Sequence, residues 1–191
     1  AWQRYVKALV GRYKGRITYW EVMNEPNTHL TPEAYLPYLK AAYETAKEVN
    51  PACKIVGVCS TSDLGGKPAP WTRRVLELGA WKYMDVMSIH MYGASAPENS
   101  FGQGSDKMMD FLKKELKKYG KTMPIWHTEK TYCTRTVGYS ARKVNRPYVY
   151  EHSKVLPTKD FKTKAEYLIR ESLLCASSGN GPFMWHGALP N

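Results

Sequence analysis

No run of about 18 consecutive apolar residues occurs in the sequence, and a membrane-spanning helix needs one of about that length. We therefore expect no membrane partner. No signal peptide is visible either. Because the chain begins inside a stretch that is patterned like a helix, we expect the true N-terminus to lie upstream. We expect a secreted or periplasmic location rather than a cytoplasmic one.

Acidic residues are scarce. The chain has 17 Asp and Glu against 28 Lys and Arg, which gives a formal charge of +11. A basic chain suggests nucleic-acid binding, but no zinc-finger, helix–turn–helix or RNA-binding signature accompanies the charge. The charge is also uneven, because residues 130–159 hold seven basic residues and one acidic residue. We therefore expect no nucleic-acid partner and keep a basic nucleic-acid-binding module only as a remote alternative.

Cysteine is equally sparse, with four residues and no CxxC spacing, so no metal site is predicted. Cys53 and Cys59 flank a strand-like run that would separate them by about 20 Å. A disulfide needs Cα atoms within about 7 Å, so these two residues should not pair. We expect Cys53, Cys59 and Cys175 to be buried free thiols. Cys133 is left open because it follows Glu129 closely.

Helical and strand-like patterns alternate along the chain. Apolar residues recur at helical spacing over 2–13, 32–49, 71–80, 106–119 and 163–178. Short runs rich in β-branched and aromatic residues predict strands at 17–23, 54–59, 85–91, 123–128 and 182–186. This alternation predicts parallel βαβ units, and with no break in composition we expect one α/β domain over residues 1–191. The long irregular stretch 130–160 is typical of a functional or disordered loop.

Two strands run into carboxylates at their C-terminal ends. WEVMNEPN, Trp20–Asn27, places Glu25 at the end of one strand, and PIWHTE, Pro124–Glu129, places Glu129 at the end of another. In a (β/α) barrel the active site lies at that face, built from strand ends and the loops after them. We therefore expect both carboxylates on one face although 104 residues separate them.

These motifs resemble clan A of the glycoside hydrolases. Asn-Glu-Pro in that clan ends the fourth strand with the acid/base, here Glu25, and Glu129 resembles the nucleophile at the end of the seventh. With Asn27 after the proline, the string is most similar to family 39 and its relatives. Met87–Gly93, MSIHMYG, resembles the sixth-strand His-x-Tyr, and Trp185 falls where the eighth-strand aromatic lies.

The resemblance implies a (β/α)8 TIM barrel, present here as a fragment from about the third helix to the eighth strand. The catalytic domain would then be incomplete at both ends, and we expect the isolated fragment to be inactive. Lys130 departs from the family pattern, since a small or aromatic residue often follows the nucleophile. This departure bears on the family more than on the clan.

The chemistry of a retaining glycosidase needs two carboxyl groups. A protonated one, Glu25, donates to the glycosidic oxygen, while an ionised one, Glu129, attacks the anomeric carbon. The donor then acts as a base on water. No metal or organic cofactor is implied. The substrate would be an oligo- or polysaccharide from a plant, microbial or algal glycan. A barrel that binds carbohydrate without turnover is the alternative, against which the retention of both carboxylates argues.

Five further residues are predicted to bind substrate, each with a plainer alternative. Asn24 resembles the clan's partner for the sugar 2-hydroxyl, or is a turn residue. His90 and Tyr92 share one strand face by period two, where Tyr92 would orient the nucleophile, or both are packing groups. His127 shares parity with the nucleophile and is predicted to point inward, or it belongs to the core. Trp185 offers a flat face for a sugar ring, or packs in the core.

The basic segment 130–159 follows the nucleophile directly and is expected to lie over the catalytic face. Its residues include Arg135, Arg142, Lys143 and Arg146. A cleft rimmed by positive charge favours glycans with uronic acid or sulfate groups, and salt should then weaken activity on them. The alternative is a solvated loop whose charge aids solubility only.

Overall fold

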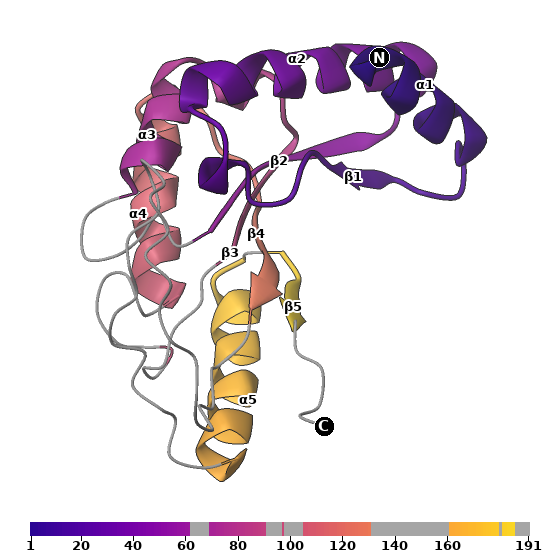
Figure 1. The fold of residues 1–191 in the computed structure, drawn as a ribbon. Coiled ribbons are helices and arrows are strands. Elements are labelled where there is room, and N and C mark those ends of the chain that lie inside the picture. Colours follow the sequence, from indigo (N-terminus) through magenta and orange to yellow (C-terminus); the bar gives the residue numbers. More distant parts are fainter. Residues whose placement is uncertain (62–68, 91–96, 98–104, 131–160, 180, 186–191) are drawn as a thin grey trace.

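The computed structural model of the chain describes residues 1–61, 69–90, 97, 105–130, 161–179 and 181–185 (Figure 1). Its α-helices are α1 (Trp2–Arg12), α2 (Pro32–Val49), α3 (Pro70–Glu77), α4 (Ser105–Lys117) and α5 (Phe161–Ser177). Its strands are β1 (Tyr19–Glu21), β2 (Lys54–Thr61), β3 (Val86–His90), β4 (Ile125–Lys130) and β5 (Phe183–Trp185). Short 3₁₀ helices are η1 (Pro26–Thr28) and η2 (Ala80–Lys82). The predicted alternation of helices and strands is confirmed.

The five strands form one parallel sheet in the order β1-β2-β3-β4-β5. Helices cover its outer face, and the inner face is concave (Figure 1). Contacts between non-adjacent strands show the curl. The rings of Tyr19 on β1 and Trp126 on β4 have centroids 4.6 Å apart, whereas a flat sheet would hold these strands about 14 Å apart. The predicted α/β barrel, present as a curled part-barrel, is confirmed.

Helix α2 shows how the sequence builds the outer layer. The hydroxyl of Thr31 accepts a hydrogen bond from the backbone N–H of Ala34, and Pro32 opens the first turn, as predicted. The helix then buries the side chains of Tyr35 and Leu39 against β2. Gly57 on β2 provides the space for this packing, because a Cβ at that position would lie 3.1 Å from the side chain of Leu39.

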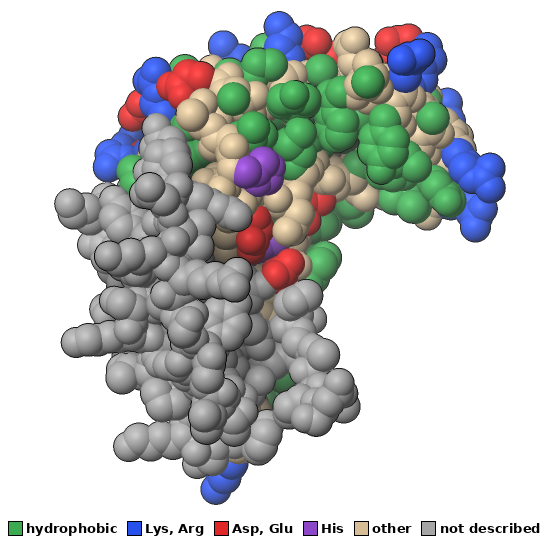
Figure 2. Space-filling view, in the orientation of Figure 1, with side chains coloured by type: hydrophobic (Ala, Val, Ile, Leu, Met, Phe, Trp, Pro, Cys, Tyr) green, Lys and Arg blue, Asp and Glu red, His purple; other side chains and the backbone are tan. Residues whose placement is uncertain are grey.

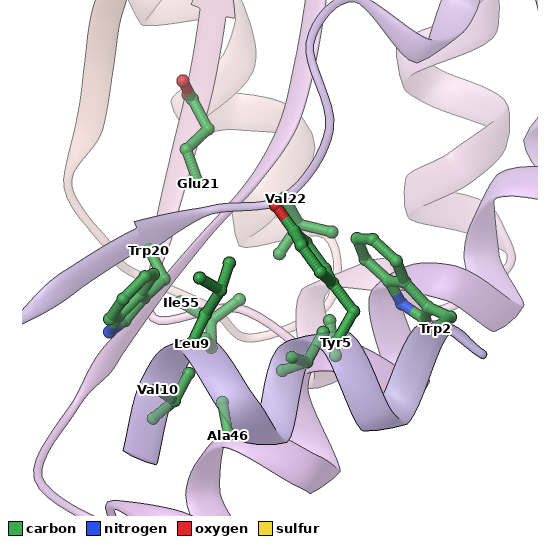
Figure 3. Close-up of a pocket in the computed structure, with 11 residues that line it drawn as sticks. Trp2, Tyr5, Leu9, Val10, Trp20, Glu21, Val22, Ala46 and Ile55 are labelled. Carbon is green, nitrogen blue, oxygen red and sulfur yellow. The ribbon is translucent and has the colours of Figure 1, made fainter. Parts of the chain in front are cut away.

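The apolar face of α1 lies against β1 less completely. Trp2, Tyr5 and Leu9 project from α1 toward the strand and, with Trp20, line an apolar pocket between the two elements (Figure 3). Tyr5 remains 58% exposed. Along β1, side chains alternate, so that Trp20 faces the helix and Glu21 points to the opposite, concave side (Figure 3).

The cysteine prediction is confirmed for the residues that the structure describes. Cys53, Cys59 and Cys175 are buried free thiols, and Cys133 lies outside the described part of the chain. None of the described helices has the length and apolar character to cross a membrane.

Candidate active site

Glu25 stands at the turn between β1 and η1. Its backbone adopts the left-handed conformation, with φ at 46°, and Met23 is left-handed as well. Non-glycine residues rarely adopt this conformation, and where they do they often mark functional sites. Pro26 then begins η1. This path leaves the Glu25 side chain half-buried on the concave side of the sheet, beside His90 at the end of β3.

Asn27 fixes that turn to the end of β2. Its side-chain amide donates to the backbone carbonyl of Thr61, and its side-chain oxygen accepts from the Thr61 N–H at 2.9 Å. Asn27 is only 2% exposed, so both bonds form away from water. The second asparagine of the NEPN string is therefore a structural clamp, which the sequence analysis used only as part of the motif.

His90 lies between the two predicted catalytic carboxylates. Its Nδ1 is 3.0 Å from Oε1 of Glu25 and 3.8 Å from Oε2 of Glu129. The imidazole is 1% exposed, while the two glutamate side chains are 23% and 22% exposed. One ligand-type atom from each of the three residues lies within 4.8 Å of the others. The carboxyl ends of β1, β3 and β4 thus bring these three residues together.

A β-bulge in β4 directs Glu129 to this position. Ile89 is paired with His127 and His90 with Glu129, so β3 advances by one residue while β4 advances by two. Thr128 is the extra residue. A bulge of this kind interrupts the alternation of side chains and is common beside active sites.

The bulge corrects the prediction for His127. Because parity changes between His127 and Glu129, the imidazole of His127 faces the outer helix layer, 3.9 Å from Oε1 of Glu171 on α5. It stacks on Phe183 and is fully buried. Lys130 faces the same layer, with Nζ 3.9 Å from Glu171. The core alternative for His127 is therefore the one that the structure supports.

A second bulge, in β2, brings a thiol to His90. Val58 pairs with Ser88 and Ser60 with Ile89, so Cys59 is the extra residue. Val58 and Cys59 both have positive φ, at 81° and 46°. The Cys59 Sγ lies 3.3 Å from Nε2 of His90, on the side of the ring opposite the glutamates.

A third carboxylate, Glu21, belongs to the same concave face. Its Oε1 accepts a hydrogen bond of 2.7 Å from the Thr128 hydroxyl across the sheet. One oxygen of Glu21 lies within 4.8 Å of the Cys59 Sγ and a ring nitrogen of His90. Figure 2 shows acidic and histidine side chains gathered where the sheet curls, beside apolar side chains near α1.

Burial shifts the pKa values of Cys59 and His127 in the directions that keep both side chains neutral. Burial, and then the negative charge of Glu21, raises the pKa of the Cys59 thiol well above its usual range. Burial, and then the positive charge of Lys130, lowers the pKa of His127 well below its usual 6.5.

The structure describes only some of the other predicted site residues. Asn24 is exposed next to Glu25, and its role at the sugar 2-hydroxyl stays a prediction. Trp185 ends β5, where it pairs with Lys130, but its side chain is outside what is described. Tyr92 also lies outside the described residues. So do the basic residues Arg135, Arg142, Lys143 and Arg146.

Glu21 and Cys59 were missed as site residues. For Glu21 the signal was present, because period two along β1 places it on the same face as Tyr19, and a carboxylate inside a barrel strand is unusual. For Cys59 no signal was available, since its position depends on a bulge. Two sets of these residues have the ligand spacing of a cation site, namely Glu21, Cys59 and His90, and Glu25, His90 and Glu129.

No protein-family model matches the chain, and no curated protein does. Solved structures do. A family 39 glycoside hydrolase from Bacteroides cellulosilyticus is 25% identical with a TM-score of 0.69, over 96% of this chain and 36% of that one. The chain has the fold of the family 39 glycoside hydrolases.

Two further structures agree with this result. A glucosidase from Croceicoccus marinus is 18% identical with a TM-score of 0.66, over 94% of this chain and 36% of that one. A family 39 β-xylosidase from Caulobacter crescentus is 14% identical with a TM-score of 0.65, over 96% and 37%. The resemblance to family 39 predicted from the motifs is confirmed, and the chain spans little more than a third of the length of these proteins.

Proposed function

We propose that the chain carries the catalytic centre of a retaining clan A glycoside hydrolase, with Glu25 as the acid/base and Glu129 as the nucleophile. The observation that carries the proposal is their spacing around His90. Carboxylate oxygens of the two residues lie within 4.8 Å of each other. Retaining enzymes hold the two carboxyl groups about 5–5.5 Å apart, whereas inverting enzymes need about 6.5–9.5 Å to admit a water.

The proposed reaction is a double displacement. The Glu25 carboxylic acid protonates the glycosidic oxygen as the bond from that oxygen to the anomeric carbon breaks, and the Glu129 carboxylate attacks that carbon to form a glycosyl ester. Glu25, now ionised, then takes a proton from water. That water attacks the anomeric carbon and releases Glu129 as a carboxylate. The sum is one water consumed and the anomeric configuration retained.

Geometry supports this division of roles. Glu25 lies on an irregular turn with its carboxyl 3.0 Å from Nδ1 of His90, a contact that can hold it in place through both of its protonation states. Glu129 projects from the bulge of β4. We propose Asn24 and Trp185 as sugar contacts beside them. A preference for anionic glycans also stays a proposal, and because Lys130 is buried against α5, it would rest on the other basic residues of 131–159.

The test uses aryl glycosides and the protein expressed with its flanking coding sequence. Glu129→Ala should abolish turnover, and azide should restore part of it by forming a glycosyl azide of inverted configuration. Glu25→Ala should lose about 10²–10⁴ in kcat/KM on substrates that need a proton at the leaving group. It should lose little kcat/KM on dinitrophenyl glycosides, whose leaving group needs no proton. With this variant azide should give a glycosyl azide of retained configuration.

Glu48→Ala is the matched control, because Glu48 is an exposed glutamate on α2. It should keep full activity on every substrate. Equal losses in the Glu25 and Glu129 variants on all leaving groups, with no glycosyl azide formed by either, would count against the assigned roles.

A further inference from the structure

The two ring nitrogens of His90 face groups of opposite hydrogen-bonding character. Nδ1 lies 3.0 Å from a Glu25 oxygen and 3.8 Å from a Glu129 oxygen, both of which are acceptors when ionised. Glu129 is ionised in the proposed mechanism, so a lone pair on Nδ1 that faced its oxygen would be repelled. Glu25 can accept from an Nδ1–H in both of its protonation states, because a carboxylic acid keeps a carbonyl oxygen as an acceptor. Nδ1 is therefore the nitrogen to which we assign the proton.

The opposite nitrogen then needs a donor. A neutral imidazole with a proton on Nδ1 has its lone pair on Nε2. The only described group within hydrogen-bonding distance of Nε2 is the Cys59 Sγ at 3.3 Å. Both Cys59 and His90 are at most 1% exposed, so no bulk water competes for this position. The thiol of Cys59 is thus placed to donate its proton to His90.

Glu21 competes with His90 for that proton, because its carboxylate is also a hydrogen-bond partner of the Cys59 thiol. Glu21 is already supplied with a donor by the Thr128 hydroxyl at 2.7 Å, whereas Cys59 is the described group that lies within 3.3 Å of Nε2. The negative charge of Glu21 has a separate effect, because it helps burial to keep Cys59 in the thiol form that can donate.

We propose that Cys59 is a positioning residue, whose S–H bond to Nε2 fixes the tautomer of His90 and so aims an Nδ1–H at the catalytic pair. The proposal rests on the proposed function for its catalytic consequence, but not for the tautomer itself. In functional sites generally, the hydrogen bond that one ring nitrogen of a histidine makes decides which of the two nitrogens carries the proton. The bulge in β2, with two consecutive non-glycine residues at positive φ, is the backbone feature that brings the thiol to the ring.

Ring ¹⁵N chemical shifts of His90 test the tautomer directly at neutral pH, with the signals assigned by their loss in His90→Gln. The wild-type protein should show a protonated Nδ1 and an unprotonated Nε2. Among the described residues, the titratable groups facing the ring are Glu21, Glu25, Glu129 and Cys59, with His127 behind. A wild-type ring with its proton on Nε2, or with protons on both nitrogens, overturns the proposal.

Variants of Cys59 test the donor. In Cys59→Ala the lone pair of Nε2 loses its donor, so the proton should no longer be confined to Nδ1 and the ring ¹⁵N shifts should move toward those of a mixture of the two tautomers. Cys59→Ser keeps an O–H donor and should resemble the wild type. Cys53→Ala is the matched control, because its buried thiol contacts the Ala46 carbonyl in the outer core instead. Identical ring spectra in the wild type and Cys59→Ala would refute the proposal.

Catalysis gives an independent readout. In the protein with its flanking sequence, Cys59→Ala should lower kcat about fivefold with KM unchanged, which corresponds to about 1 kcal/mol. Cys59→Ser should recover most of this loss. If the wild type hydrolyses no glycoside, the proposed function fails while the wild-type ring spectrum still decides the tautomer. If the enzyme is active and Cys59→Ala matches the wild type in kcat, the positioning role is wrong.

Discussion

Three ionisable side chains, His127, Lys130 and Glu171, meet with no solvent exposure between β4 and α5. Burying charges without compensation is costly, so a lysine and a glutamate in such a place are expected as a pair and the histidine as a neutral ring. The lowered pKa of His127 agrees, since burial and the neighbouring Lys130 both disfavour its protonation. These residues therefore tie the strand that carries Glu129 to the helix behind it.

The buried histidine predicts how stability depends on pH. In the unfolded chain His127 binds a proton near its ordinary pKa of 6.5, whereas in the folded chain it does so only at much lower pH. The unfolded state therefore binds more protons as pH falls below about 6.5, and the stabilisation present above that pH is lost, by up to about 1.4 kcal/mol per pH unit. Urea unfolding at a series of pH values measures this slope.

His127→Phe should flatten the slope below pH 6.5, because its ring can still stack on Phe183 but does not titrate. His29→Asn is the control, since His29 is exposed, and it should leave the slope as in the wild type. The same pH slope in His127→Phe as in the wild type would mean that His127 is not the group responsible.

Some residues of the candidate site could be predicted from the local sequence, whereas the positions of others depend on bulges in the sheet. Glu25 and Glu129 could be predicted because each lies just past a strand in a recognisable motif, and parallel strands end at one face. His90 followed from the same rule. The inward direction predicted for His127 was wrong because it assumed unbroken period two along 123–129, where the structure has a bulge. Cys59 was missed for the same reason in β2.

At the scale of elements, the two bulges in β2 and β4 bring Cys59 and Glu129 to positions beside His90. Apolar periodicity predicted the five α-helices of the described chain, and runs rich in β-branched and aromatic residues predicted its five strands, each within a few residues. Bulges leave little periodicity to detect, because each changes a single residue. They are held by tertiary contacts, of which Tyr35 on α2 provides one at β2.

Tyr35 reaches from α2 to the backbone of β2 and to that of Val22, the residue that directly follows β1. Its hydroxyl accepts from the Val58 N–H at 3.1 Å and lies 3.5 Å from the Val22 carbonyl, to which it donates. Tyr35→Phe removes the acceptor and leaves the Val58 N–H unsatisfied in the core, which should lower the free energy of unfolding by about 1–3 kcal/mol. Chemical denaturation measures the change.

Tyr5→Phe removes the hydroxyl of an exposed tyrosine on α1 and should stay within about 0.5 kcal/mol of the wild type. If Tyr35→Phe is as stable as Tyr5→Phe, the hydroxyl does not hold the β2 bulge. A loss confined to Tyr35→Phe, together with a changed His90 ring spectrum, would connect this outer-layer contact to the site.

At the scale of the whole molecule, the part-barrel leaves apolar side chains exposed at both ends of its sheet. In the described chain β1 pairs only with β2, and β5 only with β4. Tyr5 and Ile17 are 58% and 38% exposed near the β1 end, and Ile169 and Leu173 on α5 are 61% and 64% exposed near the β5 end. Open strand edges with apolar neighbours favour pairing with another chain.

We therefore expect the 191-residue chain to self-associate, with the β5 end of one copy against the β1 end of the next. A head-to-tail contact leaves one free end on each copy unless it closes into a ring, so light scattering should show a mass above that of the monomer that rises with concentration. Tyr5→Lys with Ile17→Lys should block one end, and Ile169→Lys with Leu173→Lys the other. Each double variant alone should be monomeric, and an equimolar mixture of the two should form dimers and nothing larger.

Ala52→Lys with Thr122→Lys is the control, because it adds the same charge at exposed positions in loops, and it should associate as the wild type does. A monodisperse wild-type monomer with a sharp unfolding transition would contradict the prediction. Larger species in the mixture would exclude the head-to-tail arrangement.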